Sequence, residues 1–128
     1  MSAWSEADLD RVGGAEELDL ASRRDDGSLS VFTTMWVARA GDAAYVRSAR
    51  GPTGAWYRRA VRYGVGRVRA GGVERDVTFE QIPVDEAETH AALDAAHHAK
   101  YDRYGPQIVG SVVGPDAAAV TLRLDPTH

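Results

Sequence analysis

The residues best suited to chemistry lie in residues 44–59, which combine guanidinium groups, a hydroxyl, a glycine-rich loop and adjacent aromatic rings. Arg47 and Ser48 end an expected strand, and an expected helix begins at Ala55. An arginine binds a phosphate or carboxylate through two parallel hydrogen bonds, and the free N–H groups at a helix start favour anions. The rings of Trp56 and Tyr57 offer flat faces to a planar group. The stretch therefore indicates a site for an anionic ligand that carries a ring.

The charge of the chain is divided unevenly. The formal net charge is -4, yet residues 39–75 hold nine arginines and only two acids, Asp42 and Glu74. Local positive charge beside apolar walls concentrates the field on a small anion. The acidic remainder of the chain repels a long polyanion, so nucleic acid is not an expected partner. The alternative is that these arginines are solvated or pair with the surplus acids, and that Trp56 is a core residue.

Several common kinds of site are missing from the sequence. It has no cysteine, which excludes disulfides, thiol catalysis and cysteine-ligated metals. His90, Asp94 and His97 share one helix face but lack the tight His-x-x-x-His spacing, so no metal site is expected. No P-loop, dinucleotide glycine fingerprint or Gly-x-Ser-x-Gly elbow occurs. No apolar run approaches the ~18–20 residues of a membrane span and no signal peptide is visible, so we expect a cytoplasmic protein with no membrane partner.

The hydrophobic pattern predicts a single domain over residues 1–128, mainly β with flanking helices, in the α+β class. Six strands are expected, at residues 17–20, 29–39, 43–48, 67–70, 73–82 and 120–125. The strand at 29–39 is apolar on both faces, which is typical of a central strand. Helices are expected at residues 5–14, 55–63 and 85–103, with a short one at 106–113. Ser5 is the expected N-cap of the first helix, and Asp85 with Glu88 is the expected capping pair of the third. Hairpins join most of the strands, so we expect a small six-stranded antiparallel barrel with helices at its ends and flanks.

The chain resembles the domain of unknown function 2255 (DUF2255) family of uncharacterised bacterial proteins over nearly all of residues 4–126. The similar segments are Arg24-Asp25-Asp26-Gly27, Trp36-Val37, Tyr45-Val46-Arg47-Ser48, Gly51, Trp56-Tyr57-Arg58, Gly71-Gly72, Asp76-Val77-Thr78-Phe79, Asp94-Ala95-Ala96, Lys100-Tyr101 and Thr121-Leu122-Arg123-Leu124-Asp125-Pro126. At a distance, the chain also resembles the split-barrel flavin and deazaflavin reductases. That resemblance implies a six-stranded split barrel, usually a homodimer with the cofactor near the dimer interface.

The same resemblance implies that the cofactor is bound by Arg24, Ser28, Arg47, Ser48, Trp56 and Tyr57. Gly51 and Arg58 complete the candidate cofactor-binding set, as a neutral backbone donor and a second phosphate ligand. Arg24 and Ser28 would lie in a first phosphate-contacting turn, and Arg47 would lie with Ser48 at the end of the second strand. Trp56 and Tyr57 would lie beside the ring or tail of the cofactor. This chain departs from the deazaflavin enzymes at Arg58, where they commonly have asparagine, and at Asp25 and Asp26 in the first turn.

Three functions remain open from the sequence. The first is a small oxidoreductase that binds FMN or a deazaflavin; Arg47 and Arg58 would hold the phosphate, and the candidate catalytic residues are Tyr57 and Arg47. The second is a cofactor-free small-molecule binding protein, or a biosynthetic cyclase or isomerase. In that case Arg47 would orient a carboxylate or enolate, and a tyrosine would act as the acid. The third is a non-enzymatic dimeric module, which predicts no deep polar-lined pocket.

Overall fold

The computed structural model describes residues 4–127. Its helices and strands in chain order are α1 (Glu6–Gly14), β1 (Leu18–Ser22), β2 (Thr33–Met35), β3 (Ala38–Ala40), β4 (Ala43–Arg47), α2 (Ala55–Tyr63), β5 (Val65–Ala70), β6 (Val73–Gln81), α3 (Ala87–Tyr101), α4 (Pro106–Val109), α5 (Pro115–Ala118) and β7 (Thr121–Pro126). Two short 3-10 helices lie at Gly51–Thr53 and Asp102–Tyr104.

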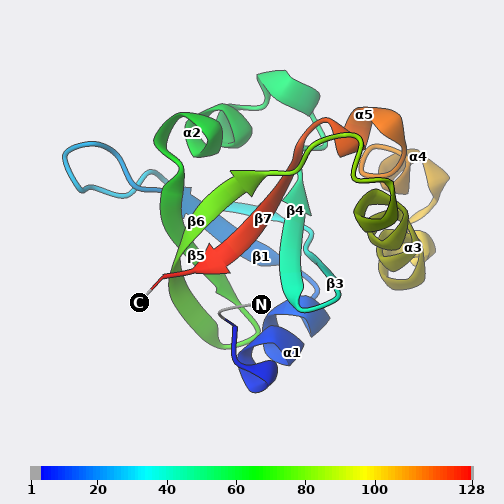
Figure 1. The fold of residues 1–128 in the computed structure, drawn as a ribbon, viewed down its shortest axis with the longest axis horizontal. Coiled ribbons are helices and arrows are strands. Elements are labelled where there is room, and N and C mark those ends of the chain that lie inside the picture. The colour runs from blue at the N-terminus through cyan, green and yellow to red at the C-terminus, as the bar shows by residue number, and fades with distance from the viewer. Residues whose placement is uncertain (1–3, 128) are drawn as a thin grey trace.

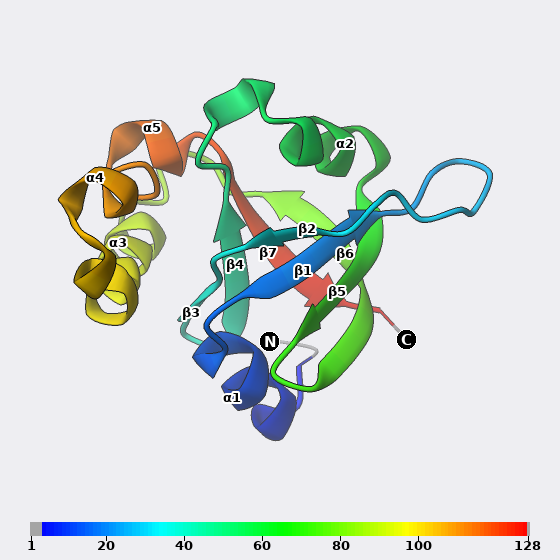
Figure 2. The same cartoon turned by 180° about the vertical axis from the view of Figure 1, so that it is seen from behind.

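The strands form one antiparallel sheet in the order β2-β1-β5-β6-β7-β4-β3. The sheet curls into a half-barrel, with α1 at one end, α2 at the other and α3, α4 and α5 stacked beside β3 and β4 (Figure 1). Seen from behind, the connection between β1 and β2 projects away from the barrel (Figure 2). The mainly β, antiparallel barrel expected from the sequence is therefore confirmed, with seven strands in place of six.

Hairpins account for much of this topology. The turn between β5 and β6 is made by Gly71 and Gly72, whose φ angles of 58° and 83° suit the two central positions of a tight hairpin turn. Val73, Val77 and Phe79 of β6 are buried, while Glu74 and Glu80, which follow Val73 and Phe79, are exposed. This alternation gives β6 one face toward the core and one toward solvent.

The expected strand at residues 29–39 is the main error of the sequence analysis. The structure has two three-residue strands there: β2 pairs with β1 at one edge of the sheet, and β3 pairs with β4 at the other. Between them, the N–H of Val37 donates to the hydroxyl of Tyr101, and the carbonyl of Val37 accepts from Lys100. Those backbone groups bind α3 side chains, so the segment crosses from one sheet edge to the other and is not a central strand.

The helix ends follow the sequence in part. The hydroxyl of Ser5 accepts a hydrogen bond from the N–H of Asp8 at 3.1 Å, which confirms the expected N-cap of α1. The predicted capping pair at Asp85 is wrong, because α3 begins two residues later with no side-chain cap. The helix expected at residues 106–113 is shorter, and α5 follows it as a separate turn. Within residues 4–127, no helix is both long and apolar enough to cross a membrane.

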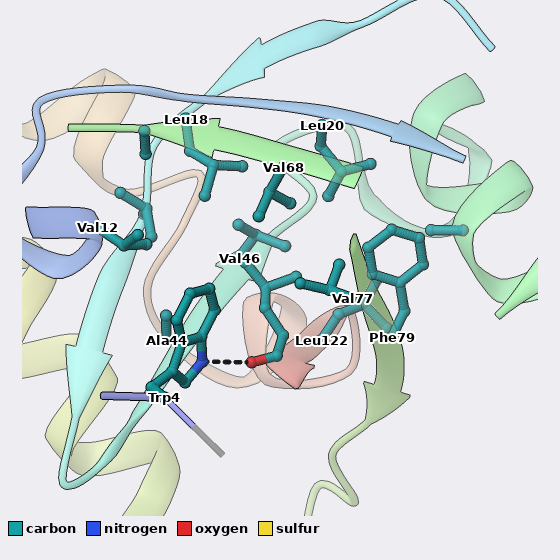
Figure 3. Close-up of a cluster of buried hydrophobic side chains, with 14 of the residues drawn as sticks. Trp4, Val12, Leu18, Leu20, Ala44, Val46, Val68, Val77, Phe79 and Leu122 are labelled. Carbon is teal, nitrogen blue, oxygen red and sulfur yellow. Dashed lines mark hydrogen bonds between the residues drawn. The ribbon is translucent and has the colours of Figure 1, made fainter. Parts of the chain in front are cut away.

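The core fills the inside of the curled sheet. Figure 3 shows Leu18, Leu20, Val46, Val68, Val77 and Leu122 converging from different strands. Trp4 lies at the edge of this cluster, and its indole N–H donates to the carbonyl of Leu124 at 2.9 Å. Leu9 and Val12 of α1 are also buried in the cluster. The barrel is thus a packed core, and a ligand must bind outside it.

One strand position admits only glycine. A Cβ on Gly66 would stand 2.0 Å from the carbonyl oxygen of Ala21 and 2.7 Å from the ring of Phe79. We therefore expect Gly66→Ala to lower the free energy of unfolding by about 3 kcal/mol, because backbone and ring must both shift. Gly14→Ala is the matched control, since its Cβ would meet no atom within 4 Å. Urea unfolding that gives equal stabilities for the two variants would contradict the close packing of β5 against β1.

Candidate functional site

A cavity of about 460 Å³ lies between β2, the loop from β4 to α2, and the segment around α4. Its lining residues are Glu17, Thr33, Thr34, Met35, Trp36, Arg47, Ala49, Arg50, Gly54, Ala55, Trp56, Arg59, Ile108, Ser111 and Val112. The volume lies within the range of small-molecule sites, and the lining combines apolar side chains with a few polar groups. This cavity is the candidate functional site.

Helix α2 supplies one wall of the cavity. Its buried face, with Tyr57 and Ala60, packs on the core, so Trp56 and Arg59 lie beside that face and line the cavity. The helix is capped by Gly54, which has no side chain to accept from the first N–H groups, and its first turn contains no acid. The N-terminus of α2 therefore presents unpaired N–H groups and a positive partial charge next to the cavity.

Trp36 supplies part of the opposite wall and is held rigidly by α3. Its ring stacks on that of Tyr101 with centroids 4.0 Å apart and planes only 3° from parallel. Tyr101 is fully buried, and burial raises the pKa of its hydroxyl to about 12. The ammonium group of Lys100 donates to the carbonyls of Gly13 and Val37 at 2.8 and 2.7 Å. These contacts fix the chain crossing that puts Trp36 in the cavity wall.

Arg47 lies at the back of the cavity, but its donors are bound to the protein. Its Nε donates to the hydroxyl of Thr121 at 3.0 Å, and its Nη1 donates to Asp94 at 2.6 Å and to the carbonyl of Val112 at 2.9 Å. Its Nη2 lies 3.2 Å from the Nδ1 of His90. Arginine has no acceptor, so His90 accepts there and its Nε2 donates to the carbonyl of Pro83. With a fully buried side chain and four of five N–H groups engaged, Arg47 ties β4 to β7 and α3.

Three of the predicted site residues, Ser48, Gly51 and Tyr57, make contacts within the fold and do not line the cavity. The hydroxyl of Ser48 donates to the carbonyl of Gly51 at 2.7 Å, which closes the turn before α2. Tyr57 is buried in the core, where burial raises the pKa of its hydroxyl, and its ring meets Trp56 edge to face. None of the three lines the cavity, whereas Trp56 does.

Arg24, Ser28 and Arg58 also lie outside this cavity. Arg24 donates to the hydroxyl of Ser28 and to the carbonyl of Leu29, within the projecting β1–β2 connection. Asp26 accepts from the N–H and hydroxyl of Ser28, and these bonds lower the pKa of its carboxyl. Arg58 is on α2 but lines a different hollow.

Two site residues were not singled out from the sequence, Arg50 and Arg59. Eight of the fourteen arginines form ion pairs with carboxylates of residues 4–127. The arginines with no such pair within these residues are Arg11, Arg24, Arg50, Arg58, Arg59 and Arg62. Four of these six lie within residues 50–62. The Nε of Arg59 is buried yet has no hydrogen-bond partner among residues 4–127. The available signal was the absence of any acid in residues 43–73, which leaves these arginines no neighbour in sequence to pair with.

The three histidines within residues 4–127 do not form a second site of the kind that holds a metal. His97 donates through Nδ1 to the carbonyl of Leu93 at 2.8 Å, and burial lowers its pKa, so the ring is neutral in the fold. Among the described residues, no group of three or more His, Cys, Asp or Glu side chains is placed to hold a metal ion.

Comparison with known proteins identifies a family and a fold. The model of a family described as "Uncharacterized protein conserved in bacteria (DUF2255)" matches residues 8–124. Among curated proteins, no sequence matches.

Several solved structures share the fold. An F420 reductase is 22% identical with a TM-score of 0.58, and the match covers 94% of this chain and 93% of that one. An FAD-binding protein from Mesorhizobium loti is 18% identical with a TM-score of 0.56, covering 98% and 91%. The heme storage protein HutZ from Vibrio cholerae is 13% identical with a TM-score of 0.62, covering 100% and 92%. At these identities the likeness shows a common split-barrel fold.

The network around Arg47 gives a stability prediction. Arg47→Ala should lower the free energy of unfolding by about 3 kcal/mol, because it leaves Asp94 and the carbonyl of Val112 without their donor. Arg50→Ala is the matched control and should change stability by less than about 0.5 kcal/mol, since its guanidinium has no partner in the described chain. Urea titrations of both variants measure this. Unchanged stability of Arg47→Ala would assign its guanidinium to ligand binding instead.

The contacts of Lys100 give a pH prediction. Desolvation lowers the pKa of Lys100 from 10.5 to about 8, so above pH 8 the folded chain binds fewer protons than the unfolded chain. The free energy of unfolding should therefore rise with pH between 8 and 9.5 relative to Lys100→Met, which cannot titrate. Urea unfolding of both proteins at several pH values measures the difference. Parallel pH dependence would show that the amine is solvated in the folded state.

Proposed function

The chain belongs to the DUF2255 family, and we propose that it is a split-barrel protein that binds a flavin-type cofactor, FMN or a deazaflavin, in the cavity beside α2. The observation that carries the proposal is the composition of the cavity wall. Trp36, Trp56 and Met35 offer apolar surface, while Arg50 and Arg59 add two guanidinium groups that form no ion pair with a carboxylate of residues 4–127. Glu17 is the acidic residue of the wall, so the two arginines outnumber it there. A phosphate ester that carries a planar ring has a flat face for the apolar side chains and an anionic group for the arginines.

The residues that line the cavity are suited to bind the phosphate group of the cofactor. Burying a donor without a partner costs free energy, and the Nε of Arg59 is such a donor in the cavity wall. A phosphate in the cavity would supply an acceptor to the guanidinium of Arg59. The N-terminus of α2 adds its positive partial charge beside the cavity, which Gly54 and Ala55 both line.

The remaining lining residues suit the ring. Trp36 is held by Tyr101, so its face is presented at low cost in conformational entropy. The hydroxyl groups of Thr33, Thr34 and Ser111 offer donors and acceptors for the polar edge of a flavin. When bound, the cofactor supplies hydride or electron transfer, and the chain's own residues bind it, orient it and exclude water. The protein would then act as a small oxidoreductase.

The geometry gives less support to the other functions. A cyclase or isomerase would need Arg47 and a tyrosine facing a substrate, but Arg47 is bound internally and no tyrosine is among the cavity's lining residues. A heme would need an axial ligand, usually a His, Cys or Tyr side chain; among the lining residues only the thioether of Met35 could serve. A homodimer remains a prediction, and so does a cytoplasmic location.

The phosphate assignment can be tested by comparing FMN with riboflavin, which has the same ring and no phosphate. Flavin fluorescence titrations should show tighter binding of FMN. The double variant Arg50→Ala/Arg59→Ala should weaken FMN binding about tenfold to hundredfold and leave riboflavin binding nearly unchanged. Arg11→Ala is the control, because it removes an arginine without an ion pair from α1, away from the cavity.

Two results would count against the proposal. Equal affinities for FMN and riboflavin in the wild-type protein would refute the phosphate site. A protein that is colourless when purified and shows no thermal shift with saturating FMN or deazaflavin would refute the cofactor itself, since binding at 100 Kd adds about 2.7 kcal/mol of stability.

A further inference from the structure

A second hollow of about 410 Å³ borders α2 and is lined by Ala55, Arg58, Arg59, Arg62 and Tyr63. Ala55 and Arg59 also line the first cavity, so the two hollows meet along this helix. The second hollow is open to solvent and strongly basic, because three of its five residues are arginines. Among the described residues, no carboxylate lies within ion-pair distance of any of the three.

The spacing of these arginines is unfavourable without an anion. Arg58 and Arg62 are four apart on α2, and Arg59 and Arg62 are three apart, so the like charges are neighbours on the helix surface. Arg62 gains some stabilisation over the ring of Tyr63, with its guanidinium carbon 5.2 Å from the ring centroid. The other two have no such contact. An anion in this hollow would relieve the repulsion.

We infer that the second hollow is a subsite for the diphosphate of a dinucleotide, so that the ligand is of the FAD class and extends from the first cavity past Arg59 to Arg58 and Arg62. This inference rests on the proposed function for the first cavity. A monophosphate bound by Arg50 and Arg59 would leave Arg58 and Arg62 unneutralised. A diphosphate carries its second phosphate one linkage further along the ligand, and Arg59, which lines both hollows, lies between the two phosphates in this arrangement.

The diphosphate subsite also gives a role to Arg58. The sequence analysis predicted that Arg58 holds the phosphate of FMN or a deazaflavin. In the structure Arg58 and Arg59 are adjacent on α2, and only Arg59 lines both hollows. Successive residues of a helix point about 100° apart. The two side chains therefore serve different parts of one extended ligand.

The test compares FMN, FAD and ADP, since ADP carries the diphosphate without the flavin ring. Flavin fluorescence measures the first two affinities and calorimetry measures the third. Wild-type protein should bind FAD about tenfold more tightly than FMN. Arg58→Ala/Arg62→Ala should remove that difference and abolish ADP binding, while FMN affinity changes less than about twofold. Arg58→Lys/Arg62→Lys keeps the charge and should retain part of the difference.

Arg11→Ala is the matched control and should leave all three affinities unchanged. Both substituted side chains, Arg58 and Arg62, are exposed, so the double variant should unfold at the wild-type temperature.

The outcomes separate the two proposals. Equal FMN and FAD affinities in the wild-type protein, or equal losses for both in the double variant, would overturn the diphosphate subsite and leave the flavin site standing. Binding of ADP that depends on Arg58 and Arg62, without binding of either flavin, would keep the subsite and overturn the flavin site. Failure of all three ligands to bind would overturn both.

Discussion

The buried guanidinium of Arg47 is the interaction on which the arrangement of the site depends. It extends from the end of β4 and joins three parts of the chain that are distant in sequence, at His90 and Asp94 of α3, at Val112, and at Thr121 of β7. A charge without solvent access is stable only when its donors and its counter-ion are supplied, so each of these partners must be in place. The same contacts hold the segment around α4 and α5 beside the barrel, and that segment forms one wall of the cavity.

Ion pairing divides the arginines into two groups with different roles. Arg67 and Arg69 of β5 pair with acids of neighbouring strands, as Arg67 does with Glu74 and Asp76 of β6. Arg39 joins β3 to α1 through Glu6 and Asp10. These pairs are at least partly exposed and contribute little each, but they neutralise the charge that the fold itself carries. The group at residues 50–62 has no such partner in the described chain, although the sequence contains 19 acids. Its charge is therefore available to a ligand.

The sequence predicted most of the fold, and its errors have a common cause. Short-range patterns gave the class, the hairpin at Gly71 and Gly72, helix α2 and the Ser5 cap, since each depends on neighbouring residues. The break at Val37 and the burial of Arg47 depend on α3, more than 40 residues away, so no local pattern reveals them. An arginine at a strand end before a glycine-rich loop gives the same local sequence pattern whether its guanidinium binds a ligand or an aspartate of the same chain. Residues 44–59 supply part of the cavity wall, but of the residues predicted to bind the cofactor only Arg47 and Trp56 line it.

The position of α2 explains why binding and folding use different residues of one short segment. Its nine residues close one end of the barrel with Tyr57 and Ala60, and Trp56 packs against the same core while it also lines the cavity. The arginines of α2 are left to line the two hollows. Gly54 has no side-chain donor or acceptor to satisfy the first turn, and the helix has no acid to balance its arginines. Both features weaken an isolated helix, since caps and opposite charges each stabilise one. Packing on the barrel compensates for that weakness, so a helix that is electrostatically unfavourable alone can present its N-terminus and its arginines to an anion.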